Sequence, residues 1–255
     1  MKIVLIGSSG AMGHVVESVV NKQKAGQIVA GFQEEVDTSR AFPTFSDFNE
    51  MNQYFTSEGK ADVIIDFSTA ALTEELLEFA QKQKLPIMLA TTGQTPEQEA
   101  KIKEAAKHIA ILDTHNTSIG VNVMEKAVGD LTKALYPLGY DVEIIEKHHR
   151  YKVDAPSGTA KMLYDSVTNN TSEDNIEVDG RSGISEPRKH QEIGVHAIRG
   201  GDIVGEHTVI FANNQEVLEI THRAGSKEIF ASGAIRGATF ILDKEAGIYD
   251  MHDAL

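Results

Sequence analysis

Short apolar runs alternate with helical patterns along the first half of the chain. The runs are almost continuously apolar, as expected for strands buried on both faces, and they span residues 2–6, 28–32, 63–67, 87–90 and 109–112. Between them, apolar residues recur at helical spacing from Met12 to Val20 and from Leu72 to Phe79. Repeated strand–helix–strand units predict right-handed crossovers and a doubly wound parallel sheet.

The pattern changes after about residue 120, where we expect a second domain to begin. A helix is predicted from Met124 to Leu135 and a strand from Asp141 to Glu146, whereas residues 169–189 are polar and predict a long surface loop. Alternating strands around 195–199, 206–211 and 216–223 predict an antiparallel meander. Its leftover apolar face would suit an oligomer interface. A last helical pattern over 229–242 would pack back on the first domain.

Length, charge and cysteine content exclude several classes of protein. With 255 residues the chain is long enough for two modest domains, and its 38 acidic against 24 basic residues give a net charge of −14. General affinity for nucleic acid or anionic membranes is therefore not expected. The absence of cysteine excludes disulfides, thiolate zinc sites and dehydrogenases with a catalytic cysteine. The chain has neither a signal-peptide pattern nor a long apolar run, so we expect a cytoplasmic protein.

A glycine-rich loop lies between the first predicted strand and the first predicted helix. Gly7, Gly10 and Gly13 would permit a tight turn, close approach of backbone N–H groups to a pyrophosphate, and close packing of helix on strand. An isolated match could equally be an ordinary glycine turn. The strand and helix context, with Glu34 and Glu35 about 20 residues further on, favours dinucleotide binding.

The acids after the second strand bear on the choice of dinucleotide. Gln33, Glu34 and Glu35 suit the two ribose hydroxyls of NADH, whereas a 2′-phosphate would prefer a basic side chain there. The glycine spacing leaves one more residue in the turn than the commonest fingerprint, and this does not remove the anion site. NADPH is the less favoured alternative.

Cationic side chains gather in residues 146–160 of this acidic chain. Such a basic segment should capture a small anion, and residues 156–159 precede a helix whose N–H groups would bind a carboxylate or phosphate. The competing interpretation is a solvated loop before an ordinary helix. Chelation of a metal by His148 and His149 is doubtful because adjacent side chains on a strand point to opposite faces. Proton donation by histidine or lysine remains.

Several motifs together point to one known family. They occupy residues 7–13, 66–69, 90–93, 116–122, 146–160, 199–207 and 219–224. The most specific is the His-His-x-x-Lys-x-Asp-Ala-Pro-Ser-Gly-Thr run that begins at His148. Over nearly its whole length the sequence resembles the 4-hydroxy-tetrahydrodipicolinate reductase (dihydrodipicolinate reductase) family of bacterial lysine and diaminopimelate synthesis.

The resemblance implies a fold and a reaction. The fold is α/β, with a Rossmann-like doubly wound sheet and an α+β domain whose sheet is mostly antiparallel. A dinucleotide-binding domain would span 1–119, completed by about 229–255, and a substrate-binding and tetramerisation domain would span 120–228. The protein would use NADH or NADPH to reduce the dihydrodipicolinate-type product of dihydrodipicolinate synthase to tetrahydrodipicolinate. The nicotinamide would give a hydride and a cationic histidine or lysine a proton.

The resemblance also assigns roles to individual residues. His148 and Lys152 would be the proton donors, and a homotetramer without a metal is implied. The substrate carboxylates would be held by His149, Lys152, Ser157, Gly158 and Thr159. The cofactor would be held by Gly7, Ser8, Ser9, Gly10, Ala11, Met12, Ala90, Thr91, Thr92, Thr114, His115, Asn116 and Thr117, with Gln33 and Glu34 at the ribose. Ala11 stands where the family often has arginine, and Glu34 and Glu35 where it often has a base, which disfavours a 2′-phosphate.

Two other functions compete with this one. A non-catalytic dinucleotide sensor would explain the glycine loop but would leave residues 146–160 without a role. A reductase of another small dicarboxylate or imino acid would use both segments. Consumption of NADH in the presence of the dihydrodipicolinate synthase product separates the three, because a sensor does not turn over and another reductase ignores that substrate.

Overall fold

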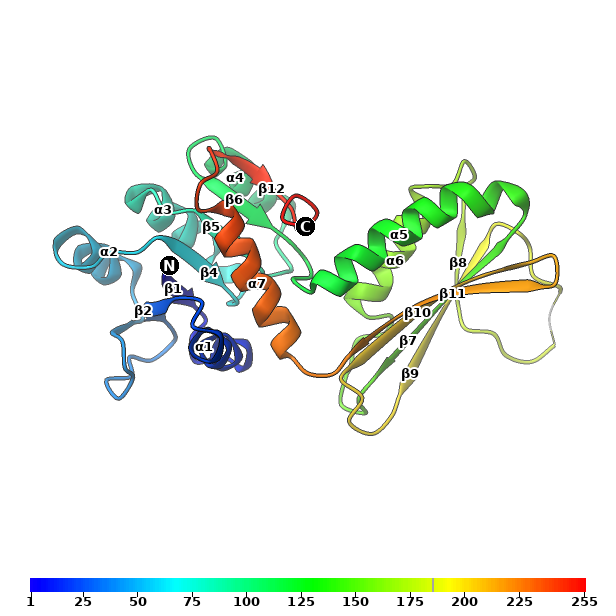
Figure 1. The fold of residues 1–255 in the computed structure, drawn as a ribbon, viewed down its shortest axis with the longest axis horizontal. Helices are drawn as coiled ribbons and strands as arrows, with labels where there is room; N and C mark the ends of the chain where they lie inside the picture. The colour runs from blue at the N-terminus through cyan, green and yellow to red at the C-terminus, as the bar shows by residue number, and fades with distance from the viewer. Residues whose placement is uncertain (185) are drawn as a thin grey trace. The chain divides into compact units, whose positions relative to one another are not determined.

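The computed structural model describes residues 1–184 and 186–255, which form two compact units. Unit 1 contains Met1–Ile119 together with Lys227–Leu255, and unit 2 contains Gly120–Ser226. Figure 1 shows the blue and cyan N-terminal segment and the orange helix and red strand of the C-terminal segment in the same unit. Unit 1 is therefore discontinuous in sequence, whereas unit 2 is one insertion within it.

Unit 1 is built on a parallel sheet, as the apolar runs predicted. In the described residues its strand order is β12-β6-β5-β4-β1-β2-β3 and every pair is parallel. The strands are β1 (Lys2–Ile6), β2 (Gln27–Phe32), β3 (Thr44–Phe45), β4 (Val63–Asp66), β5 (Ile87–Leu89), β6 (Ala110–Asp113) and β12 (Gly247–Tyr249). The order reverses between β1 and β4, so a crevice is expected at the carboxyl ends of these two strands.

Helices cover both faces of this sheet because its strands are apolar on both sides. Ile3 and Leu5 of β1 face one layer, and Val4 and Ile6 face the other. The first layer contains α1 (Ala11–Gln23) and α7 (Glu228–Ile241). The second contains α2 (Phe48–Ser57), α3 (Thr73–Gln83, after the short η1 at Ala70–Leu72) and α4 (Pro96–Ala105). The C-terminal helix thus completes a core that the N-terminal segment leaves open.

Unit 2 contains a mixed sheet with helices on one face. Its order is β11-β10-β7-β9-β8, with the longer ladders antiparallel, β10 against both β7 and β11. The strands are β7 (Asp141–His148), β8 (Ile176–Asp179), β9 (Glu192–Arg199), β10 (Gly205–Asn213) and β11 (Glu216–Ala224). The helices are α5 (Ile119–Leu135), followed by the short η2 (Tyr136–Leu138), and α6 (Gly158–Thr168). Their apolar sides form one core with the inner face of the sheet.

Two expectations for unit 2 were wrong. The last three strands do not form a meander, because β7 lies between β9 and β10 and pairs in parallel with β9. The segment 169–189 is not all loop, since it contains β8, which adds to the sheet edge in parallel with β9. The first error concerns the order of strands in the sheet, which alternation within one strand does not encode. The second is a missed four-residue strand in a segment whose polar composition predicted a loop.

No helix among the described residues is long and apolar enough to cross a membrane.

Candidate functional site

The glycine loop of unit 1 has the geometry of an anion cradle. Gly7 has a φ of 80°, a left-handed conformation that favours glycine, and α1 starts directly after Gly10. An added Cβ at Gly13 would lie 2.3 Å from the Gly7 carbonyl oxygen, so only glycine permits this packing of α1 on the loop. At Gly10 an added Cβ would meet only the Gly7 oxygen, at 3.3 Å, which leaves space outside the turn. The first N–H groups of α1 have no partner within the helix and can bind an anion there.

The side chain of Gln33, just after β2, is hydrogen-bonded to this loop. The buried Ser8 hydroxyl donates to Gln33 Oε1 at 2.7 Å, and Gln33 Nε2 donates to the Glu35 carbonyl oxygen at 2.7 Å. The amide of Gln33 is therefore engaged within the protein. Glu34 and Glu35 are exposed beside it.

Arg40 is a basic neighbour of the loop that the sequence did not reveal. Its Nη2 donates to the Ser8 carbonyl oxygen at 2.8 Å, its Nη1 lies 3.1 Å from a Glu17 carboxylate oxygen, and its guanidinium lies over the Phe42 ring. Only 13% of the side chain is exposed. The connection between β2 and β3 brings this cation to the loop, and Glu17 pairs with its charge.

The other predicted cofactor residues lie at the same edge of the sheet. Residues 90–92 follow β5 and residues 114–117 follow β6, so both segments leave carboxyl ends of parallel strands, as the glycine loop does. Thr114 Oγ1 donates to the Asn116 carbonyl oxygen at 2.9 Å, and Thr117 Oγ1 donates to the Phe230 carbonyl oxygen at 2.8 Å. The second contact fixes this segment to α7. The structure thus brings the predicted cofactor residues to one edge and fits a dinucleotide.

In unit 2, His148 at the end of β7 contacts a buried carboxylate. Its Nδ1 lies 2.6 Å from Glu146 Oε2, and Glu146 is completely buried. Burial opposes ionisation of Glu146, but hydrogen bonds from Arg199 and His148 outweigh it and lower the pKa of this carboxyl below its ordinary value. Because an ionised carboxylate only accepts hydrogen bonds, Nδ1 of His148 must carry a proton.

Arg199, at the end of β9, joins Glu146 to the loop that carries Lys152. Its two terminal nitrogens each lie 2.7 Å from a Glu146 oxygen, a bidentate pair. The same guanidinium donates to the carbonyl oxygens of Lys152, at 3.3 Å, and Asp154, at 2.6 Å. The ammonium of Lys152 lies 2.8 Å from Asp154 Oδ1, and the Lys152 side chain is 22% exposed.

The N-terminus of α6 lies against the same carboxylate. The Ser157 N–H donates to Glu146 Oε1 at 3.1 Å, while its hydroxyl caps α6 by accepting from the Ala160 N–H. That hydroxyl is also 3.0 Å from His207 Nε2 and is buried. At Gly158 an added Cβ would meet nothing within 4 Å, so the start of the helix has open space beside it.

His207 of β10 is a buried neutral histidine next to His148. The two rings are 5.2 Å apart, edge to face. Burial and the nearby His148 lower the pKa of His207 to about 4. At neutral pH this imidazole is therefore uncharged and adds no cation to the site.

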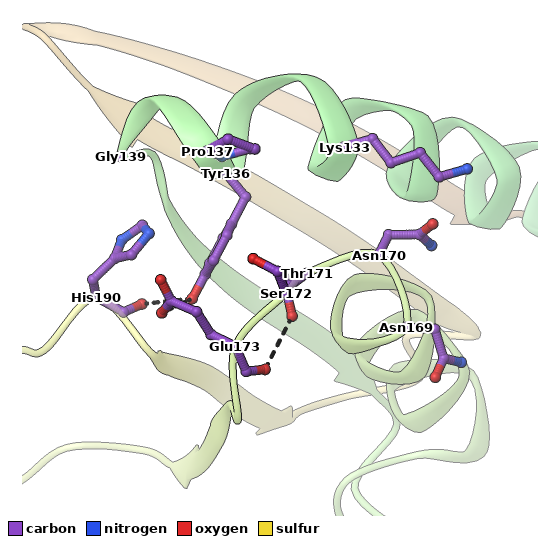
Figure 2. A pocket seen from close by; sticks show the side chains of 10 residues that line it. All are labelled: Lys133, Tyr136, Pro137, Gly139, Asn169, Asn170, Thr171, Ser172, Glu173 and His190. Atoms are coloured by element: carbon purple, nitrogen blue, oxygen red, sulfur yellow. Dashed lines mark hydrogen bonds between the residues drawn. The ribbon is translucent and has the colours of Figure 1, made fainter.

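A cavity of about 580 Å³ lies elsewhere in unit 2. Figure 2 shows its lining around Tyr136, whose hydroxyl donates to Glu173 at 3.3 Å and accepts from Asn175 at 2.9 Å. Gly139, which lines this cavity, precedes β7, whereas His148 lies at the other end of that strand, which is about 23 Å long at the rise of an extended strand. None of the predicted site residues lines this cavity.

The structure adds functional candidates that sequence reasoning did not assign. Glu146, Arg199 and His207 were inside recognised motifs, but no role was given to them. A signal existed, because the alternation of Val142 and Ile144 puts Glu146 on the buried face of its strand, where a carboxylate needs partners. The identity of those partners depends on strand pairing and could not be read from the spacing.

Together, the parallel sheet with its glycine loop and the polar cluster of unit 2 define a pyridine-nucleotide oxidoreductase of the Rossmann class. The chain matches the family model described as "Dihydrodipicolinate reductase, N-terminus" over residues 1–117 and the one described as "Dihydrodipicolinate reductase, C-terminus" over residues 120–255. The chain belongs to the dihydrodipicolinate reductase family.

Individual relatives agree with this assignment. The chain is 41% identical to the 4-hydroxy-tetrahydrodipicolinate reductase of Clostridium novyi, covering 100% of this chain and 98% of the relative. It is 39% identical to that of Methanocorpusculum labreanum, covering 100% of this chain and 99% of the relative. Among solved structures, the dipicolinate-bound dihydrodipicolinate reductase from Paenisporosarcina sp. TG-14 superposes with a TM-score of 0.82 at 19% identity, covering 100% of this chain and 99% of that one. Because its sequence identity is low, this structural similarity supports the fold alone.

Proposed function

We propose that this protein reduces the dihydrodipicolinate-type product of dihydrodipicolinate synthase to tetrahydrodipicolinate, using a reduced nicotinamide dinucleotide. The observation that carries the proposal is the juxtaposition of His148, the Lys152 loop and the N-terminus of α6 around one buried carboxylate. Membership of the family supports the same reaction. A dinucleotide sensor would not need this cluster.

The residues of unit 2 suit a reduction that needs an acid. When bound, the dinucleotide supplies the hydride. Addition of that hydride to an unsaturated ring conjugated with an imine moves electron density onto the ring, and an adjacent cationic acid stabilises this density and protonates the product. His148 and Lys152 are the proton donors in this proposal. His148 carries a proton on Nδ1, and its Nε2 lies on the side of Gly205, where no Cβ crowds it.

The substrate in this proposal is a small dicarboxylate. Its carboxylates would contact His149, Lys152 and the first turn of α6, from Ser157 to Thr159. The N-terminal end of a helix favours negative charge, and Gly158 leaves space for an oxygen to approach. Nδ1 of His149 is buried without a hydrogen-bond partner in the described residues. The solved relative from Paenisporosarcina is a dipicolinate complex, which agrees with this substrate class.

NADH is the cofactor that unit 1 suits best. Glu34 and Glu35 are exposed at the end of β2, and neither Ala11 nor Gln33 offers a cation for a 2′-phosphate. Arg40, the base beside the loop, is paired with Glu17. We expect calorimetric titration to give a Kd for NADH at or below that for NADPH. A Kd for NADPH at least tenfold below that for NADH would contradict this expectation. If Arg40→Leu then removed the preference for NADPH, Arg40 would be the cation that binds the 2′-phosphate.

The uncovered face of the unit 2 sheet suits a homotetramer. The helices pack on the inner face, whereas Ile198 and Val217 on the outer face are 45% and 61% exposed. Light scattering coupled to size exclusion should give four copies, and Val217→Glu should reduce the assembly. A monomer at micromolar concentration would contradict this part of the proposal.

The deciding experiment is a coupled assay with dihydrodipicolinate synthase. We expect loss of NADH absorbance only when the synthase, its two substrates and this protein are all present. Calorimetry on the same preparation measures NADH binding. Binding without turnover would favour the sensor, and turnover only with another unsaturated dicarboxylate or imino acid would favour the other reductase.

A further inference from the structure

The carboxylate of Glu146 is the point at which three separate segments of unit 2 meet. Oε2 accepts from His148 and Arg199, and Oε1 accepts from Arg199 and the Ser157 N–H. Through Arg199 it also reaches the carbonyl oxygens of Lys152 and Asp154. One buried group thus connects the acid on β7, the lysine loop and the first turn of α6.

The geometry around His148 leaves one ring nitrogen for chemistry. Nδ1 donates to Glu146 at 2.6 Å, whereas Nε2 has no hydrogen-bond partner among the described residues. Gly205 lies next to this atom, and an added Cβ there would be 3.2 Å from Nε2. In a neutral histidine, the hydrogen bond that the ring makes decides which nitrogen carries the proton. Here the bond to Glu146 places that proton on Nδ1.

We propose that Glu146 is a positioning residue for the reaction: it holds His148 with Nδ1 protonated and Nε2 presented to the substrate, and through Arg199 and Ser157 it keeps the lysine loop and the α6 N-terminus in register with that nitrogen. This inference rests on the proposed function for the identity of the acid. It assigns no substrate contact to Glu146, which is completely buried.

The alternative is that Glu146 and Arg199 form a structural ion pair only. Removing one partner of such a buried pair destabilises the protein whatever happens to catalysis, because the other charge is left buried without a partner. Loss of stability therefore does not discriminate between the two roles. The tautomer of His148 and the energetic coupling between Glu146 and His148 do.

The first test needs no substitution in the network. Nitrogen-15 NMR of the unmodified protein at alkaline pH, with His148 assigned by comparison with His148→Ala, should show His148 neutral and protonated on Nδ1. A neutral His148 protonated on Nε2 would overturn the proposal. This result does not depend on the substrate, so it stands even if the coupled assay shows that the proposed function is wrong.

The second test is a double-mutant cycle on turnover. Glu146→Gln should lower kcat by about 10–100-fold, by analogy with the loss of a partner that orients a metal-ligating histidine, with a smaller change in KM. In the His148→Ala background the same change should lower kcat by a clearly smaller factor, because the part of its effect that passes through His148 is then absent. Equal effects in both backgrounds would establish the structural role and overturn the proposal.

Two further variants make the cycle interpretable. Glu104→Gln, which removes an exposed carboxylate paired with Lys107, is the control and should retain parental kcat. If Glu146→Gln lacks a cooperative unfolding transition, the cycle is run with Glu146→Gln and Arg199→Gln combined, which leaves no unpaired charge in the buried site. Parental kcat in that folded double variant would overturn the proposal.

Discussion

The glycine loop of unit 1 and the polar cluster of unit 2 (Glu146, His148, Arg199, Ser157 and His207) are both proposed to lie beside an anion, and they are built by different physical means. The loop uses backbone N–H groups and the absence of side chains at Gly7, Gly10 and Gly13. The cluster uses ionisable side chains from β7, β9 and β10. The action of the loop therefore depends on its shape and should respond little to pH. The action of the cluster depends on which of its side chains are protonated and on the hydrogen bonds between them.

The largest expected effect separates chemistry in unit 2 from binding in unit 1. His148→Ala should lower kcat by about 10²–10⁴-fold, the range typical of a general acid, with little change in KM. Lys152→Ala should lower kcat steeply and also raise KM, because the ammonium would attract a substrate carboxylate. Steady-state kinetics and NADH titration measure both. Near-parental kinetics in both variants would show the assigned mechanism to be wrong. Weakened NADH binding would show that these residues of unit 2 also contribute to cofactor binding.

Two glycine variants test whether the loop acts by shape. Gly13→Ala should destabilise the protein by about 1–3 kcal/mol, as overpacking does, because its Cβ would lie 2.3 Å from a backbone oxygen. Gly10→Ala should leave stability within about 0.5 kcal/mol of the parent but raise the Kd for NADH about tenfold, since the methyl group occupies the open side of the turn. Denaturant unfolding and calorimetry give the two quantities. An unchanged Kd for NADH in Gly10→Ala would show that the pyrophosphate does not bind at this turn.

A smaller effect is expected for a methyl group placed beside His148. Gly205→Ala should lower kcat several-fold and at most about tenfold, because the new Cβ lies 3.2 Å from Nε2 and displaces the ring without changing any charge. Gly200→Ala, where an added Cβ meets nothing within 4 Å, is the matched control. Stopped-flow measurement of NADH consumption compares them. Equal rates for the two variants would show that Nε2 does not face the substrate.

A further expected effect, on stability and not on turnover, concerns pH. The pKa of His207 is about 4 in the folded protein, against an ordinary value of 6.5. A histidine with a lowered folded-state pKa contributes fully above pH 6.5, and its contribution is lost progressively as the pH falls toward 4. His207→Gln should therefore flatten the pH dependence of the free energy of unfolding in this window. His108→Gln, which replaces an exposed histidine, is the matched control variant. A curve for His207→Gln parallel to that of the parent would contradict the neutral state assigned to His207.

Sequence reasoning succeeded where the required information is contiguous. The parallel strands of unit 1 were predicted because burial on both faces produces nearly continuous apolar runs such as Lys2–Ile6. The glycine loop was predicted because its turn, its cradle and the start of α1 all fall within residues 7–13. The basic segment was predicted for the same reason, since His148, Lys152 and the α6 N-terminus lie within a few residues of one another.

The sequence by itself therefore determined the sheet type of unit 1, the glycine loop between its first strand and first helix, and the family, whereas the roles of His148 and Lys152 as acids stay predictions. Only the tertiary structure decided that β7 separates β9 from β10, and that Arg199, His207 and Arg40 reach the sites they contact. The physical reason is that spacing along one segment dictates which face a side chain occupies, whereas a partner some fifty residues away depends on strand order and register. Alternation could place Glu146 in the interior, but only the pairing of three strands shows which groups neutralise it.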